Sequence, residues 1–134
     1  MSPSHTFTAT FVSYEDQGDC AVVSLADDAE DPRDYLIFQR AYEFTQQDIQ
    51  LGMDAVHVER NGQVGSGYGG LRRVTLSRER LTLELDERGA ELMDGTTFMR
   101  EDLDLSIADS KKLCVGLRAC FEGMSFYADE VGLG

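Results

Sequence analysis

The chain has 134 residues, of which 42% are hydrophobic, and its formal net charge at pH 7 is −13. This length suffices for one domain with its own core, and the hydrophobic content excludes a disordered chain. The negative charge disfavours binding to nucleic acid or anionic lipid and favours a basic protein partner, with simple solubility as the alternative explanation. We therefore predict a single domain spanning residues 1–134.

The predicted compartment is the cytoplasm. No apolar run approaches the roughly 18 residues that a membrane-spanning helix needs. The N-terminal residues lack the basic and apolar segments of a secretory signal. The three cysteines, Cys20, Cys114 and Cys120, are expected to be reduced thiols that pack as small hydrophobic side chains.

The first predicted elements form a hairpin. Alternation over Thr6–Tyr14 predicts a strand with Phe7, Ala9 and Phe11 on its buried face. Turn-forming residues follow, and the run Cys20–Ala26 then predicts the return strand. This second strand is apolar on both faces, which indicates a position inside a sheet.

An acidic loop, residues 27–34, follows the hairpin. Pro32 disfavours helix here, and five carboxylates occupy eight positions: Asp27, Asp28, Glu30, Asp31 and Asp34. Such a cluster repels itself unless it is solvated, binds a metal or faces a basic partner. The spacing lacks the central glycine and the final glutamate of a calcium-binding EF-hand loop, so a partner is favoured over calcium.

The central part of the chain is predicted to alternate between strands and turns. Tyr35–Arg40 is a strand that is apolar on both faces, and Thr45–Leu51 fits a single helical turn capped by Thr45. Ala55–Arg60 is a further strand with a valine-rich face. Asn61-Gly62 then predicts a type I′ hairpin turn into a glycine-rich strip.

The C-terminal half continues with β periodicity and ends in a helix. Arg72–Ser77 and Leu81–Asp86 predict a hairpin with a charged outer face, and Thr96–Ile107 predicts another strand. Between them, residues 87–95 fit either a short helical turn or a loop.

The C-terminal helix is predicted over residues 111–123, with Asp109 or Ser110 as its N-cap. Its apolar stripe consists of Leu113, Leu117, Cys120, Phe121 and Met124. The predicted fold is α+β and β-rich, with a mainly antiparallel sheet or meander of about eight strands and one C-terminal helix.

The run Gly65-Ser66-Gly67-Tyr68-Gly69-Gly70 matches a dinucleotide-binding pattern by letter. A phosphate site of that kind needs a helix directly after the glycines, and LRRVTLSR has the periodicity of a strand. We predict a kinked or bulged strand at which another backbone approaches closely.

No catalytic or metal-binding constellation stands out. His5 and His57 are the only histidines, and no thiol or ligand spacing accompanies them. Asp48 and Asp54 flank a possible cleft, but capping and turn formation explain them better than acid–base chemistry. We predict that the protein is not an enzyme and carries no metal or cofactor.

Three segments together resemble the Imm10-type immunity proteins of bacterial polymorphic toxin systems: YLIFQR at Tyr35–Arg40, then Gln47–Glu59, then Gly67–Leu85. These segments cover roughly the middle half of the chain, in the element order given by the residue patterns. The resemblance implies a non-enzymatic inhibitor that binds a cognate toxin domain in the producing cell. The resemblance does not indicate which reaction the toxin catalyses.

Two groups of residues are predicted to contact the partner. The first is the acidic loop, chosen for its charge and flexibility, and the second is central, chosen for the resemblance and its expected exposure: Gln47, Asp48, Met53, Asp54 and Tyr68. Two other functions stay open. One is a small-ligand-binding domain or small enzyme with a cleft at the glycine strip, and the other is a structural subunit that self-associates through a strand edge.

Overall fold

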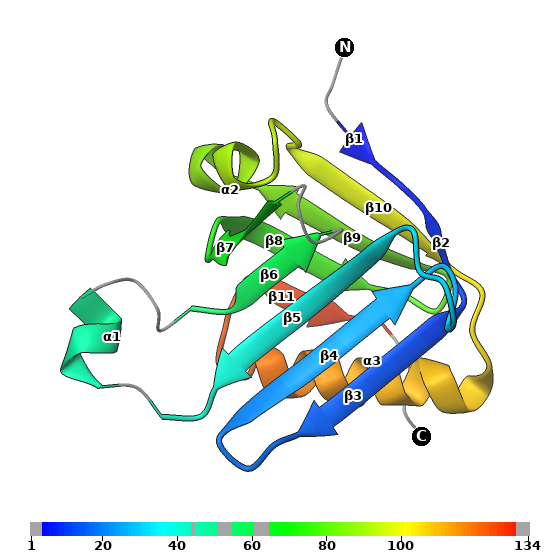
Figure 1. Ribbon diagram of the computed structural model, residues 1–134, viewed down its shortest axis with the longest axis horizontal. Coiled ribbons are helices and arrows are strands. Elements are labelled where there is room, and N and C mark those ends of the chain that lie inside the picture. The colour runs from blue at the N-terminus through cyan, green and yellow to red at the C-terminus, as the bar shows by residue number, and fades with distance from the viewer. Residues whose placement is uncertain (1–3, 44, 51–54, 61–64, 131–134) are drawn as a thin grey trace.

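The computed structural model describes residues 4–43, 45–50, 55–60 and 65–130 (Figure 1). Five strands form what we call the front sheet, in the order β3-β4-β5-β6-β7, with all neighbours antiparallel. They are β3 (Phe11–Asp16), β4 (Cys20–Ala26), β5 (Tyr35–Ala41), β6 (His57–Arg60) and β7 (Gly65–Tyr68).

The back sheet has the order β1-β10-β9-β8-β11, and β2 also pairs with β10. Its strands are β1 (Ser4–His5), β2 (Thr8–Ala9), β8 (Leu71–Leu76), β9 (Arg80–Leu85), β10 (Phe98–Leu103) and β11 (Tyr127–Asp129). The central three are antiparallel, whereas β1 and β2 run parallel to β10, and β11 runs parallel to β8.

Three described helices complete the fold: α1 (Gln46–Gln50), α2 (Glu87–Leu92) and α3 (Ile107–Cys120). The prediction of a β-rich α+β fold with a C-terminal helix is confirmed. The described part of the chain has eleven strands rather than about eight, because the terminal segments add short parallel strands. The segment left open as helical turn or loop is helix α2.

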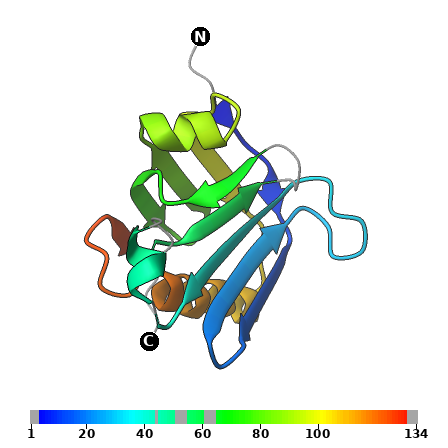
Figure 2. The ribbon, with the colours of Figure 1, turned by 60° about the vertical axis from the view of Figure 1, so that its left-hand side comes forward.

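The core lies between the two sheets and under α3 (Figures 1 and 2). Fully buried side chains from the front sheet, such as Val23 and Phe38, share one cluster with Leu83 and Met99 of the back sheet. From α3, Leu117 joins the same cluster. All three cysteines are free thiols and are buried, as predicted.

The predicted first strand, Thr6–Tyr14, is in fact divided between the two sheets. β2 pairs with β10 of the back sheet, and after Thr10 the chain continues as β3 of the front sheet. The alternation of side chains therefore breaks at the crossing. Phe7 and Ala9 are buried as predicted, but Val12 is buried in place of Phe11, which faces outward.

A buried carboxylate holds the N-terminal segment to the back sheet. Glu101 is fully buried in β10, and its Oε2 accepts a hydrogen bond from the Phe7 N–H at 2.8 Å. The Asp102 N–H donates to the Phe7 carbonyl at 2.9 Å. These bonds satisfy the backbone of Phe7 between β1 and β2, where an unpaired buried group would be costly.

The glycine strip is where helix α2 contacts the sheets. A Cβ at Gly70 would lie 2.5 Å from the Gly89 Cα, and a Cβ at Gly89 would overlap the Gly70 carbonyl oxygen. The following segment is strand β8, with a register shift after Leu71. The predicted kinked strand with a close backbone approach is confirmed, and no helix follows the glycines as a phosphate site would require.

Helix α3 begins four residues earlier than predicted. Its N-cap is Ser106, whose Oγ accepts a hydrogen bond from the Asp109 N–H at 3.1 Å. Asp109 thus lies in the first turn, where its charge suits the helix dipole, and the predicted cap at Asp109 or Ser110 is wrong. The S-x-x-D pattern at Ser106 is a capping-box signal that identifies this start.

Strand β11 is fastened to α3 by a bidentate ion pair. Arg118 Nε and Nη2 each donate to an Asp129 carboxylate oxygen at 2.8 Å, and the Tyr127 hydroxyl donates to the same carboxylate at 3.0 Å. The guanidinium is the main cause that lowers the pKa of Asp129. The C-terminal segment therefore docks as a parallel edge strand of the back sheet.

We predict that Gly89→Ala lowers the free energy of unfolding by about 3 kcal/mol or more, because the new methyl group overlaps the Gly70 backbone. Gly95→Ala is the matched control. Gly95 has a φ of +82° and nothing within 4 Å of an added Cβ, so the substitution should cost only about 1–2 kcal/mol for the left-handed backbone. Equal losses in urea denaturation would contradict this account of the strip.

Candidate partner-binding face

The outer face of the front sheet is exposed to the solvent and partly apolar. None of the described elements covers it in Figure 1, whereas the opposite face meets the back sheet and α3. Strand registers place Phe11, Ala26 and Tyr35 in one row across β3, β4 and β5. Ser24 and Ile37 lie together in the next row. Half-buried aromatic and aliphatic side chains at an open sheet face are typical of an interaction surface.

The outer face of the back sheet differs, because its charges pair with one another. Arg73 and Glu84 lie 3.6 Å apart across β8 and β9, on the charged outer face predicted for this hairpin. Arg80 and Arg100 both contact Asp102, at 3.4 and 3.7 Å. These five side chains carry three positive charges and two negative ones, so they offer a basic partner no excess of negative charge, unlike the acidic loop beside the front sheet.

The predicted acidic loop joins β4 to β5 and stands out from the front sheet (Figure 2). Its base is closed by Asp27, whose Oδ1 accepts from the N–H groups of Arg33 and Asp34 at 3.0 and 3.3 Å. The Thr10 hydroxyl donates to the Asp27 carbonyl at 2.8 Å. One of the predicted contact residues therefore has a structural role at the base of the loop.

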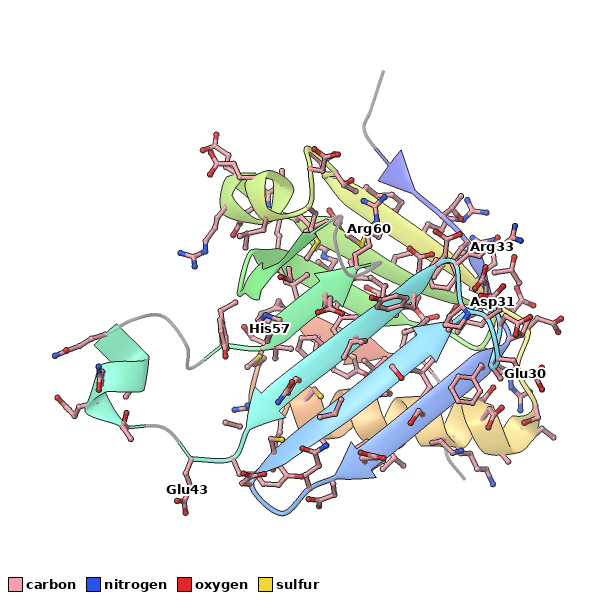
Figure 3. All side chains as sticks on the ribbon, in the orientation of Figure 1. Glu30, Asp31, Arg33, Glu43, His57 and Arg60 are labelled. Atoms are coloured by element: carbon pink, nitrogen blue, oxygen red, sulfur yellow. The ribbon has the colours of Figure 1, made fainter. Side chains whose placement is uncertain are left out.

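Asp28 shapes the tip of the same loop. Its Oδ1 accepts from the N–H groups of Glu30 and Asp31 at 2.8 and 3.1 Å, which is an Asx turn. These two backbone bonds lower the pKa of the Asp28 carboxyl below its ordinary value. Glu30 and Asp31 themselves are exposed at the tip (Figure 3).

An apolar pocket of about 220 Å³ lies between this loop and the outer face of the front sheet. The sheet contributes Phe11, Ser24, Ala26, Tyr35 and Ile37, and the loop contributes Asp28, Ala29 and Pro32. The Tyr35 hydroxyl donates to Glu59 Oε2 at 3.3 Å, which fixes its ring at the pocket. The pocket thus combines apolar walls with an acidic rim.

The two predicted groups of contact residues are placed differently. The acidic loop lies at one end of β5, and α1, which includes Asp48 and the exposed Gln47, follows the other end (Figure 1). β5 spans roughly 20 Å at the usual rise of a strand. Tyr68 lies on the outer face in edge strand β7, with its ring 4.8 Å from that of His57. Met53 and Asp54 lie outside the described residues.

Sequence reasoning missed the pocket residues on the strands. A sequence pattern could have identified them, because the strands predicted over Cys20–Ala26 and Tyr35–Arg40 are apolar on both faces. That pattern predicts a position inside a sheet, and β4 and β5 are indeed internal strands. Because one sheet face is open here, the same residues also form an apolar outer surface.

The cleft predicted as an alternative at the glycine strip also has a counterpart. A second cavity of about 220 Å³ is lined by Ala55, Val56, Gly69, Gly70, Leu71, Met124 and Phe126. Among the described residues, this lining includes no titratable side chain, so they supply no acid, base or nucleophile.

The described residues form neither a cluster of metal ligands nor a membrane-spanning helix. No group of three or more His, Cys, Asp or Glu side chains in this part of the chain is arranged to hold a metal ion. None of the described helices has the length and apolar character that crossing a bilayer requires.

Comparison with known families decides the assignment. The family model of Immunity protein 10 matches residues 6–111, which is 106 of the 134 residues. The chain belongs to the Immunity protein 10 family. The match includes every strand of the front sheet, the acidic loop and all the residues of the pocket beneath it. No curated protein matches the chain.

We predict that order at the loop tip depends on pH through Asp28. A folded-state pKa below the ordinary 3.8 means that ionised Asp28 stabilises the turn above that pH. The stabilisation is lost as the pH falls through the folded-state pKa. NMR titration of the Asp28 carboxyl carbon should give a pKa below 3.8, with the protection of the Glu30 and Asp31 amides, measured against their intrinsic exchange rates, lost over the same range. The Asp28→Ala variant should show no such protection at any pH, and a pKa at or above 3.8 in the wild type would contradict the turn.

Proposed function

We propose that this Immunity protein 10 member binds and neutralises a cognate bacterial toxin domain in the cytoplasm of the producing cell, without catalysing a reaction. The family assignment is the observation that carries the proposal. The net charge of −13 suits a partner with a basic surface, as expected of a toxin whose substrate is anionic.

We assign the toxin to the outer face of the front sheet and the acidic loop. The front sheet and the loop offer an apolar pocket beside carboxylates that face the solvent. On the outer face of the back sheet, acidic side chains instead form ion pairs with arginines of the same sheet. A basic toxin surface over this face would meet Glu30 and Asp31 first, because both are exposed at the tip of the loop. Covering the toxin's active site in this way would inhibit it.

The proposed function predicts that a neighbouring gene encodes a large secreted protein, and it is tested by co-expressing this chain with the C-terminal domain of that protein. The wild-type chain should rescue growth and co-purify with the toxin domain as a stoichiometric complex. Continued growth arrest without a complex would contradict the proposal. Turnover of a substrate by the isolated chain would contradict the assignment as a non-enzyme.

The contribution of the loop is tested by reversing its charge. The double variant Glu30→Lys, Asp31→Lys should slow association at low salt by roughly tenfold or more and make it less sensitive to salt, because steering depends on these charges. The control is Glu91→Lys, Glu122→Lys, which changes the net charge equally at exposed positions on α2 and after α3. If both variants slow association equally in stopped-flow measurements, the loop has no special role.

A further inference from the structure

We infer that the pocket beneath the β4–β5 loop is an anchor site for one apolar side chain of the partner, carried on a segment with lysine or arginine on both sides of it. The inference rests on the proposed function, because the partner in question is the toxin domain. It goes further by specifying the chemistry of the toxin segment that the pocket recognises.

The size of the pocket favours a side chain over a cofactor or metabolite. Small-molecule sites usually have volumes of roughly 300–1,000 Å³. The pocket has about 220 Å³ and is formed at an open sheet face. A single leucine, methionine or phenylalanine side chain suits this space, and anchor residues of protein interfaces occupy pockets of this kind.

The walls of the pocket specify an apolar occupant. Phe11, Ala26 and Ile37 present hydrocarbon from the sheet, and Ala29 and Pro32 present it from the loop. The Tyr35 hydroxyl is already bonded to Glu59. A polar side chain entering here would lose water and gain few hydrogen bonds, whereas an aliphatic side chain would gain the full benefit of burial.

The rim of the pocket specifies basic neighbours for that side chain. Asp28 lines the pocket, and Glu30 and Asp31 follow it on the exposed tip of the same loop. The backbone bonds to Asp28 hold the tip in place and favour the ionised form of its carboxylate by lowering its pKa. Cationic residues beside the anchor would therefore meet fixed negative charge, which sets the register of the segment.

Three peptides test this chemistry directly by NMR titration of the labelled protein. They are acetyl-Gly-Arg-Leu-Arg-Gly-amide, the same peptide with serine in place of leucine, and the leucine peptide with glutamate in place of both arginines. The first should bind tighter than either of the others by roughly tenfold or more, because each of them lacks one of the two features. Its shifts should centre on Ser24, Ala26 and Ile37.

A pocket-filling variant makes the test specific to the site. Ser24→Leu places a larger apolar side chain within the lining and should weaken binding of the Arg-Leu-Arg peptide by roughly tenfold. The control is Thr75→Leu, at a half-buried position of β8 in the back sheet, which should bind the peptide as the wild type does. Urea denaturation of both variants shows whether each is folded.

The outcomes separate this inference from the proposed function. Equal binding of the three peptides, shifts away from the pocket, or unchanged peptide binding by folded Ser24→Leu would overturn the anchor site. If the wild-type chain still rescues growth in that event, the immunity function stands without the anchor. If the Arg-Leu-Arg peptide binds in the pocket but the toxin domain is not neutralised, the anchor chemistry stands and the assignment to a toxin fails.

Discussion

The passage of the chain from one sheet to the other at Thr10 is the constraint on which the candidate site depends. Before Thr10 the backbone pairs with β10, and after it the backbone pairs with β4. The Thr10 N–H donates to the Ala26 carbonyl at 2.9 Å, and its hydroxyl donates to the Asp27 carbonyl. The crossing is thereby bonded to the end of β4 and to the start of the acidic loop.

This crossing sets which side chains reach the outer face. In a continuous strand, Phe11 would lie on the same face as the buried Ala9. The change of sheet instead turns Phe11 outward and Val12 inward. Phe11 then pairs across to Ala26, which pairs across to Tyr35. One row of the front sheet thus supplies apolar wall residues directly beside the loop that supplies the charge.

The loop can hold five carboxylates because the backbone compensates some of them. Asp27 and Asp28 accept main-chain N–H bonds at the base and at the tip, so part of the negative charge maintains the shape of the loop. Glu30 and Asp31 are then presented at a defined place rather than on a mobile chain. Preorganised charge of this kind favours fast association with a basic partner, since little ordering is needed on binding.

Much of the fold could be predicted from the sequence, because local patterns determine it. Alternation identified the hairpins of both sheets, and the residues after Gly70 excluded a phosphate-binding helix. The division at Thr10 could not be predicted, since alternation looks the same whether a strand continues in one sheet or changes sheets. The start of α3 at Ser106 was missed although its capping signal is local.

The candidate site was predictable only in its charged part. The acidic residues are adjacent in sequence, so their cluster is visible without a structure. The pocket joins β3, β4 and β5, and only the strand registers bring Phe11 and Ile37 to the same face. The second predicted group is divided between α1 and β7, and two of its members lie outside the described residues. A family resemblance identifies matching positions in the sequence and does not show which of them are neighbours in space.

Hydroxyl-radical footprinting of the complex with the cognate toxin domain tests the central claim most directly, because it measures the exposure of individual side chains. The outer face of the front sheet should be protected, with oxidation of Phe11, Tyr35 and Ile37 falling on binding. Ile107 and Val115, which are 68% and 48% exposed on α3, should be oxidised equally in the free and bound chain. Protection of the two α3 residues with unchanged oxidation of the front-sheet residues would contradict the account.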